Sequence, residues 1–463
     1  MMIVWLAIGA CLAAVVATAP LRWAAAVVVF TLPLAGTAVL MLGAEPLLLP
    51  LVVTLGFLAR HGFSLLIPNV RAQFMGILVS DLPMVGFVVY CVVSGALFPK
   101  LFAGATLVTP QAYGMPTPLS AANISYPQII YLFAGAYLYL ALRQTMMRVG
   151  MAPFMYALIA QAAVFGGIGL VQAGLGLGGI QLPLGWILNN QGYAILSGNM
   201  QGGFARVNSV FVEASSFAVW GTGMLAFCYA LFVSGIRPIL MFCLTCMLGV
   251  VLLLSTSSTA YAGILFVGAF ALILAMLDSD TARRDRGLIL LAVVGLLGAL
   301  AAVVVFSADS GFAGQLRAMI ETMTVGKSTS WSAYERSMWA RMSVQNALDT
   351  WMLGIGYGAG RGSGIFTTLF GLIGAPGMIL FAMVMAPLVM RAFKRPKTGE
   401  EAVMSSGALA LAATLAAMGV ASPDLSLSNI FWVFLAVAAA PLAHRVPQPA
   451  APSAPPAVAG RPA

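Results

Sequence analysis

Residues 214–254 read ASSFAVWGTGMLAFCYALFVSGIRPILMFCLTCMLGVVLLL, and this stretch decides the fold. It holds two apolar runs, 214–234 and 237–254, which meet at a short turn that carries Arg237. An α-helix needs roughly 17–25 apolar residues to cross a bilayer core of about 30 Å. Because both runs are continuous and lack the alternation of a membrane β-barrel, they predict a helical hairpin across a membrane.

The rest of the chain repeats this pattern. Its residues are 61% hydrophobic and only 8% charged, and a mean hydropathy of +1.00 excludes an ordinary soluble domain. We therefore predict an all-α, polytopic integral membrane protein with about 12–14 transmembrane helices. The apolar runs lie at 3–19, 23–43, 46–60, 73–98, 127–142, 151–173, 214–234, 237–254, 258–277, 287–306, 364–390, 402–421 and 427–443.

The two chain ends and the apolar runs within 23–60 allow more than one interpretation. Residues 23–60 are read either as two short crossings or as a re-entrant pair, which leaves the side of the N-terminus open. The first run has no basic residue before it, so we expect an uncleaved first helix rather than a signal peptide. We predict one transmembrane domain, 1–443, followed by a Pro/Ala-rich tail, 444–463, that is disordered and cytoplasmic.

The net charge of +9 could indicate nucleic-acid binding, but the basic residues are distributed differently. They concentrate in alternate short loops such as DSDTARRDR, 278–286, and RAFKRPKTGEE, 391–401. This distribution matches the excess of Lys and Arg in cytoplasmic loops, so no nucleic-acid partner is expected. The Lys and Arg residues left for the outer side are Lys100, Arg206, Arg317, Lys327, Arg336, Arg341 and Arg361.

Three longer segments then face outward: 99–126, 174–213 and a large periplasmic loop, 307–363. Within that loop, AYERSMWARMSVQNALDTWMLG, 333–354, has apolar residues at helical spacing. The pattern predicts an amphipathic helix on or near the bilayer surface. Its expected apolar face consists of Met338, Met342, Ala347, Leu348 and Trp351.

The outward segments carry side chains suited to holding an anion. Arginine binds phosphate through paired, charge-assisted hydrogen bonds and stays ionised, and fixed guanidinium groups stabilise a pyrophosphate leaving group without a metal. A carboxylate such as Glu213 could orient or deprotonate an attacking hydroxyl. The candidates for one cationic cavity at the outer membrane surface are Arg206, Glu213, Tyr334, Arg336, Arg341 and Arg361.

These residues also have plainer interpretations. Arg206 and Glu213 could merely pair with each other and cap the helix that follows. On an α-helix Arg336 and Arg341 lie about 140° apart, so one of them could reach lipid headgroups instead. The glycine-rich GIGYGAGRG, 354–362, is expected to be a flexible turn.

Three other polar features have structural interpretations as well. STSSTAY, 255–261, is expected to be an outward-facing turn explained by helix capping. Asp81 lies within a predicted span and is either a kink partner beside Pro83 or a proton carrier. Cys243 and Cys246 have metal-ligand spacing, but no second pair or nearby His completes a site, so no metal is expected.

Three stretches resemble the O-antigen ligase and Wzy-type polysaccharide polymerase superfamily. RVNSVFVEASSFA, 206–218, is similar to the family segment that runs from an arginine to a Phe-x-Glu and a serine before a membrane helix. YERSMWARMSVQNALDTWMLGIGYG, 334–358, is similar to the family's outer-loop helix and the Gly-x-Gly turn that ends it. LFGLIGAPGMILF, 369–381, is similar to the Gly-Leu-Ile-Gly run that starts the next span.

The resemblance implies a GT-C-like glycosyltransferase in a bacterial inner membrane, with its active site at the periplasmic face. It implies undecaprenyl-pyrophosphate-linked glycans as donor and acceptor, no metal or other cofactor, and a chain-length regulator as a partner protein. The resemblance implies catalytic roles for Arg206, Glu213 and Arg336 and a substrate-binding role for Ser215. Independently of it, Arg341, Tyr334 and Arg361 are expected to line the cavity and bind substrate.

Three functions remain open at this point. Ligases of the family usually carry a His before Gly-Leu-Ile-Gly, whereas this run is GRGSGIFTTLFG, 360–371, which favours the polymerase branch. The expected activity is therefore polymerisation of exopolysaccharide, capsule or O-antigen repeat units with inversion at the anomeric carbon. The alternatives are a ligase that transfers glycan to lipid A or protein, and a flippase for lipid-linked sugars.

Overall fold

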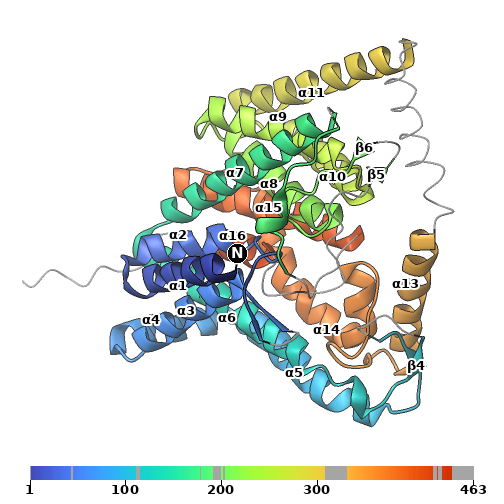
Figure 1. Cartoon of the computed structure of the whole chain (residues 1–463). Helices are drawn as coiled ribbons and strands as arrows, with labels where there is room; N and C mark the ends of the chain where they lie inside the picture. The colour runs from blue at the N-terminus through green and yellow to red at the C-terminus, as the bar shows by residue number, and fades with distance from the viewer. Residues whose placement is uncertain are drawn as a thin grey trace, which may run out of the picture.

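The computed structural model describes residues 2–42, 45–110, 115–177, 179–190, 200–201, 204–307, 331–420, 425 and 430–440. It is a mostly helical bundle with three short two-stranded hairpins (Figure 1). The elements are α1 (Met2–Thr18), α2 (Leu21–Thr31), β1 (Ala38–Leu42), β2 (Glu45–Leu48), α3 (Leu49–Ser64), α4 (Pro68–Ser80), α5 (Leu82–Leu101), β3 (Leu107–Val108), β4 (Thr117–Pro118), η1 (Ala121–Asn123), α6 (Tyr126–Val149), α7 (Ala152–Leu177), η2 (Leu184–Trp186), β5 (Met200–Gln201), β6 (Phe204–Ala205), α8 (Ala214–Val233), α9 (Pro238–Leu254), α10 (Ser258–Leu277), α11 (Thr281–Ser307), α13 (Trp331–Asp349), α14 (Ile365–Val389), η3 (Met390–Phe393), α15 (Gly399–Val420) and α16 (Phe431–Ala439).

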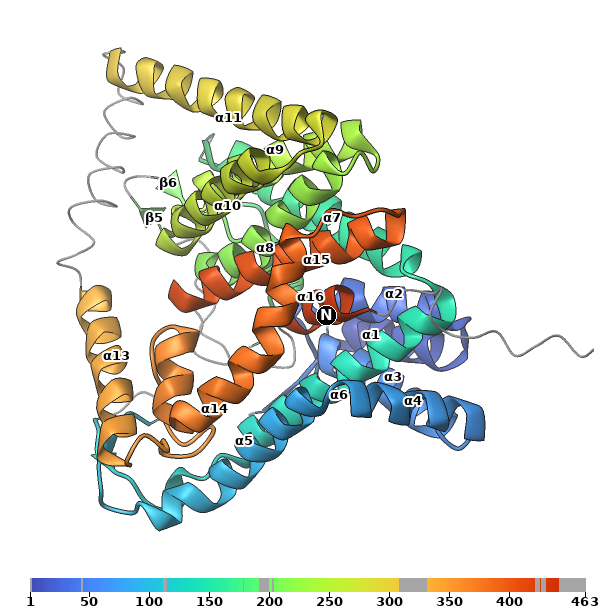
Figure 2. The ribbon, with the colours of Figure 1, turned by 180° about the vertical axis from the view of Figure 1, so that it is seen from behind.

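Helix α8 lies at the centre of the bundle beside α15 and α16, as the front and back views agree (Figures 1 and 2). In its apolar stretch 83% of the residues are buried inside the protein, against 28% for α10. Small residues allow this close packing: a Cβ placed on Gly223 would lie 2.3 Å from Thr414 Oγ1 of α15. A Cβ on Gly263 of α10 would lie 2.2 Å from Thr222 Oγ1 of α8. In a bilayer the hydrophobic effect does not drive helices together, because lipid tails are as apolar as the helix surfaces. Membrane helices therefore associate through close packing at small residues.

The structure confirms an α-helical, multi-pass membrane architecture. Among the described residues, 7 helices are long and apolar enough to cross a bilayer, or up to 8 if α3 and α4 form one bent span. Three more apolar helices, α1, α2 and α9, are shorter than 18 residues. The larger number of about 12–14 crossings stays a prediction, because these short helices fall near or below the length that spans hydrocarbon.

Two of the predicted early spans are wrong in their bounds. The run 23–43 does not continue as a helix, since α2 ends at Thr31 and β1 then pairs antiparallel with β2. The helix α3 bends by 112° into α4, so the part that follows the hairpin is a broken pair rather than one straight crossing. The apolar composition of 23–60 hid the hairpin, because β-hairpin and helix residues are equally hydrophobic here, and the bend between Ser64 and Pro68 lies beyond this stretch.

The predicted span 73–98 is broken at Asp81, which ends α4 and precedes α5. The Asp81 carboxylate forms an ion pair with Arg143 of α6 and accepts a hydrogen bond from Tyr139 Oη at 2.8 Å. A carboxylate in an apolar bundle is stabilised by such partners. Asp81 is therefore the anchor of a helix break, which corrects its placement inside a continuous span and favours the kink interpretation.

Helix α14 is also broken, at Gly374, where φ is 60° and ψ is −165°. The turn after α13 satisfies the backbone groups that the break releases: Ile355 N donates to Gly371 O at 3.1 Å and Gly356 N to Leu372 O at 2.8 Å. On the other side, Ala375 N donates to Met352 O at 2.8 Å. The Gly-Leu-Ile-Gly run, 371–374, thus lies inside the span and does not start it, because α14 already begins at Ile365.

Gly374→Ala is expected to destabilise the protein strongly. The new Cβ would lie 2.0 Å from Met352 O, and a φ of 60° is unfavourable for alanine. We expect the free energy of unfolding to fall by about 1–3 kcal/mol, measured as a lower midpoint of thermal unfolding in detergent. Gly268→Ala in α10 is the matched control, since nothing lies within 4 Å of its new Cβ and alanine favours helix. Equal midpoints for the two variants would show that the break at Gly374 does not need glycine.

Candidate functional site

Arg206 lies in the extended segment between β6 and α8, and α7 anchors this segment. Gln172 Oε1 of α7 accepts from the backbone N–H groups of Asn208 and Ser209 at 3.1 and 2.8 Å, and its Nε2 donates to Asn208 Oδ1 at 2.8 Å. Ser209 Oγ donates to Phe165 O, also in α7, at 2.7 Å. These bonds fix the chain at Asn208 and Ser209, directly after Arg206 and Val207, so α7 anchors the segment that carries Arg206.

Glu213 is the residue that precedes α8, but it does not cap that helix through its side chain. Its Oε1 accepts hydrogen bonds from the hydroxyls of Ser215 and, at 3.4 Å, Ser216. A carboxylate is favourable at a helix N-terminus because of the positive end of the helix dipole. The sequence ASS after Glu213 therefore supplies two hydroxyls that orient the carboxylate, and capping does not explain the residue.

Arg206 and Arg336 come from segments about 130 residues apart and act on each other electrostatically. Burial lowers the pKa of the Arg206 guanidinium, the negative charge of Glu213 opposes this, and the positive charge of Arg336 lowers the pKa further. No ion pair within 4.0 Å joins Arg206 to Glu213 in the part of the chain that the structure describes. The plain alternative, a mutual pair that needs nothing else, is therefore not what the structure has.

The Nε atom of Arg206 is buried and makes no hydrogen bond to any described residue. A buried donor without an acceptor is costly, and more so when a second positive charge is close. Two like charges are stable together when an anion with several acceptor oxygens lies between them. The arrangement of Arg206, Arg336 and Glu213 therefore fits an anionic ligand flanked by one carboxylate.

Helix α13 confirms the helix expected in the large loop, but its buried face differs from the predicted one. The buried residues are Ser343, Asn346, Ala347 and Thr350, whereas Leu348 and Trp351 are exposed. The helix packs on α14 and β3 through small and polar contacts, for example between Thr106 Oγ1 and the Asn346 amide at 3.1 Å. Hydrophobic periodicity therefore identified the helix, and the exposure of Leu348 and Trp351 leaves them available to a bilayer surface, whereas Ala347 of the same predicted face packs inside the protein.

Arg336 lies on the inner face of α13, because positions 336, 343, 347 and 350 share one side of a helix. Arg341 and Tyr334 lie on the opposite, exposed face. The structure thus separates the arginine pair in the way the helix geometry requires, and of the two only Arg336 is among the charges that shift the pKa of Arg206. Arg341 is suited to water or lipid headgroups.

Arg361 is held against α13 from the glycine-rich turn. Its guanidinium lies 4.4 Å from the ring centroid of Trp339, and its backbone N–H donates to Thr109 O at 2.9 Å. Residues 354–360 are buried, which corrects the expectation of a flexible turn. The turn is a packed connection between α13, α14 and the segment around β3.

The serine-rich turn after α9 also differs from the expectation. Ser255, Thr256 and Ser257 are at most 2% exposed, and Ser257 precedes α10 without a side-chain capping bond. Tyr261, in the first turn of α10, acts electrostatically on Arg206 and donates through Oη to Leu253 O at 3.0 Å. Sequence reasoning missed both Tyr261 and the anchor Gln172, since neither belongs to a recognisable motif.

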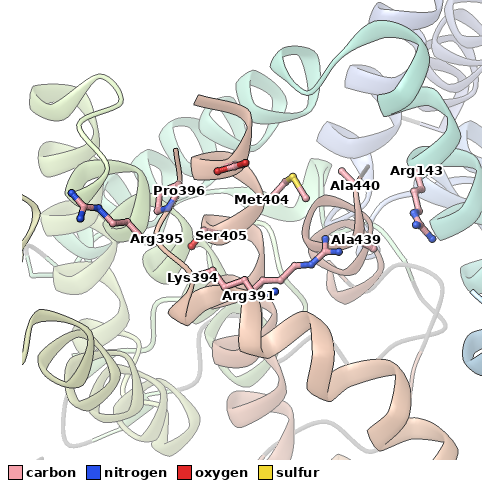
Figure 3. A pocket seen from close by; sticks show the side chains of 10 residues that line it. Arg143, Arg391, Lys394, Arg395, Pro396, Met404, Ser405, Ala439 and Ala440 are labelled. Carbon is pink, nitrogen blue, oxygen red and sulfur yellow. The ribbon is translucent and has the colours of Figure 1, made fainter. Parts of the chain in front are cut away.

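A separate cavity of about 370 Å³ lies at another place in the bundle, between α6, η3, α15 and the end of α16 (Figure 3). Four basic side chains line it, Arg143, Arg391, Lys394 and Arg395, together with Glu401. Its position among the basic loops distinguishes it from the arginine site. No group of three or more His, Cys, Asp or Glu side chains suited to a metal ion occurs within the described ranges.

Comparison with known proteins leaves the family open. No protein-family model matches the sequence, and no curated protein matches it significantly. The functional interpretation therefore depends on the motifs and on the geometry of the site.

Proposed function

We propose that the protein is a glycosyltransferase that polymerises undecaprenyl-pyrophosphate-linked repeat units at the periplasmic face of a bacterial inner membrane. The observation that carries the proposal is that Arg206, whose buried Nε lacks an acceptor among the described residues, lies within the electrostatic influence of Arg336 from a separate segment and of the Glu213 carboxylate. A diphosphate would supply negative charge to balance the two guanidinium groups and oxygen atoms to accept hydrogen bonds from them, including one from Arg206 Nε. Glu213 supplies the one carboxylate that such a transfer needs.

The reaction is a single displacement at the anomeric carbon of the donor. An acceptor hydroxyl forms the new C–O bond, the bond from the anomeric carbon to the pyrophosphate oxygen breaks, and undecaprenyl pyrophosphate leaves with the electron pair. Glu213 accepts the hydroxyl proton. The hydroxyls of Ser215 and Ser216 donate to its Oε1 and so orient the carboxylate. Arg206 and Arg336 stabilise the charge that develops on the leaving oxygen. One displacement inverts the anomeric configuration.

One observation favours a flippase as the second candidate. Helix α14 is broken at Gly374, and α3 bends by 112° into α4. Broken helices are typical of transporter binding sites, where unwound backbone lines the substrate path. In α14, however, the turn after α13 already satisfies the released backbone groups, which argues for a structural break.

A deletion strain separates the candidates. A polymerase defect leaves single repeat units on lipid at the outer face, and a ligase defect leaves full-length polymer on lipid. A flippase defect leaves single repeats that an added periplasmic glycosidase cannot reach. We expect accessible single repeats, and the other two results would exclude polymerisation.

A further inference from the structure

The cavity that Arg143, Arg391, Lys394 and Arg395 line has no part in the proposed reaction. These side chains come from α6 and from the η3–α15 connection, and Figure 3 shows Arg143 and Arg395 on opposite sides of the space. The volume of about 370 Å³ is enough for a phosphate-containing headgroup. The remaining wall is apolar at Met404, Ala439 and Ala440, as a site at the edge of lipid requires.

Nearby carboxylates neutralise only part of this charge. Arg143 pairs with Asp81, and Arg395 pairs with Asp280 at 3.1 Å. Glu401 Oε2 accepts from the backbone N–H of Lys397 at 2.6 Å. Lys394, by contrast, makes no side-chain hydrogen bond or ion pair with any residue that the structure describes. A lysine in this position is available to an external anion.

Buried donors at the same place also lack acceptors. Arg143 Nε is buried and makes no hydrogen bond among the described residues. A second cavity of about 130 Å³ shares Lys394, Arg395 and Ser405 with the first, and Arg283 in its wall has a buried Nη1 without a partner. Two adjoining cavities with unsatisfied guanidinium donors are more than the scattered surface charge that orients a membrane protein.

We propose that this cavity binds the phosphate group of an anionic ligand, with Lys394 as the residue that contacts it directly. The apolar wall and the location between membrane helices identify an anionic phospholipid headgroup as its source. Basic pockets between transmembrane helices are recognised sites for such headgroups. This inference is independent of the proposed glycosyl transfer, because the cavity and the Arg206–Arg336 site share no residue.

The test compares full-length protein in nanodiscs of phosphatidylcholine alone and with phosphatidylglycerol added. Phosphatidylglycerol is expected to raise the midpoint of thermal unfolding, and the rise should grow with the logarithm of its concentration above the dissociation constant. Lys394→Gln should raise the phosphatidylglycerol concentration needed for a given rise in the midpoint about fivefold. This is the effect on affinity of removing one cation near a charged lipid. Lys394→Gln should leave the midpoint in phosphatidylcholine unchanged, which shows that the variant folds.

Lys397→Gln is the matched control, because Lys397 lies in the same connection and is not part of the cavity wall. It should keep the full phosphatidylglycerol dependence. A second arm adds inorganic phosphate to protein in phosphatidylcholine; stabilisation there that Lys394→Gln abolishes assigns the site to a soluble phosphate of the same chemistry. Equal responses of the two lysine variants, or no stabilisation by either phosphate source, would overturn the proposal.

Discussion

Replacing Arg336 with alanine is expected to abolish polymer and leave single repeat units on the lipid carrier. The substitution removes a positive charge that acts on Arg206. In the proposed mechanism it thereby removes a group that stabilises the leaving pyrophosphate. Loss of one such electrostatic contact typically lowers the rate about 10²–10³-fold. Gel analysis of extracted polysaccharide and of lipid-linked intermediates measures the change.

Arg341→Ala provides the control for this prediction. Arg341 belongs to the same helix and carries the same charge, but it lies on the exposed face of α13. It should retain near-normal polymer at equal protein abundance. Polymer of normal length in the Arg336→Ala strain, or an equally severe defect with Arg341→Ala, would contradict the role assigned to the inner face of the helix.

Glu213→Gln should be nearly as severe, because glutamine keeps the shape and removes the group that accepts the proton. General-base contributions are typically 10²–10⁴-fold in rate. Since Glu213 makes no side-chain capping bond to α8, the variant should unfold close to the midpoint of the parent protein, lowered only by the loss of about 0.3–1 kcal/mol of interaction with the helix dipole. The two measurements are polymer formation in a purified system and thermal unfolding of the same preparation.

Ser215→Ala tests whether Ser215 only orients the Glu213 carboxylate, which is the group that accepts the proton in the proposed mechanism. Ser215 donates to the Glu213 carboxylate and orients it, so its loss should reduce activity by much less than Glu213→Gln. If Glu213→Gln retains full activity, Glu213 has no catalytic role. If instead its unfolding midpoint falls along with its activity, the residue is structural.

The sequence predicted the membrane class and the helix α13, and it singled out Arg206 and Arg336, whose charges act on each other in the structure. Arg206 and Arg336 could be selected because charges are rare in a chain that is 61% hydrophobic, and such charges are costly near a bilayer. Helix geometry already stated that Arg336 and Arg341 point about 140° apart. It could not state which of them faces inward, since that depends on the packing of α13 against α14.

Other features could not be read from periodicity. The β1–β2 hairpin and the breaks at Asp81 and Gly374 occur inside apolar runs, where helix and strand have the same hydrophobic signal. Gln172 reaches the Arg206 segment through contacts made between distant parts of the chain. The buried state of the 255–257 turn likewise follows from neighbouring helices, because its serines and threonines alone favour a surface turn.

The central claim is that Arg206 and Arg336 together bind a diphosphate. The most direct test is a double-mutant cycle on the binding of farnesyl pyrophosphate, a short lipid pyrophosphate, to full-length protein in nanodiscs. Each single alanine variant should weaken binding about 10–100-fold, as expected for a charge-assisted contact, and the double variant should lose less than the product of the two. Single variants that bind as tightly as the parent, or strictly multiplicative losses, would contradict a shared diphosphate site.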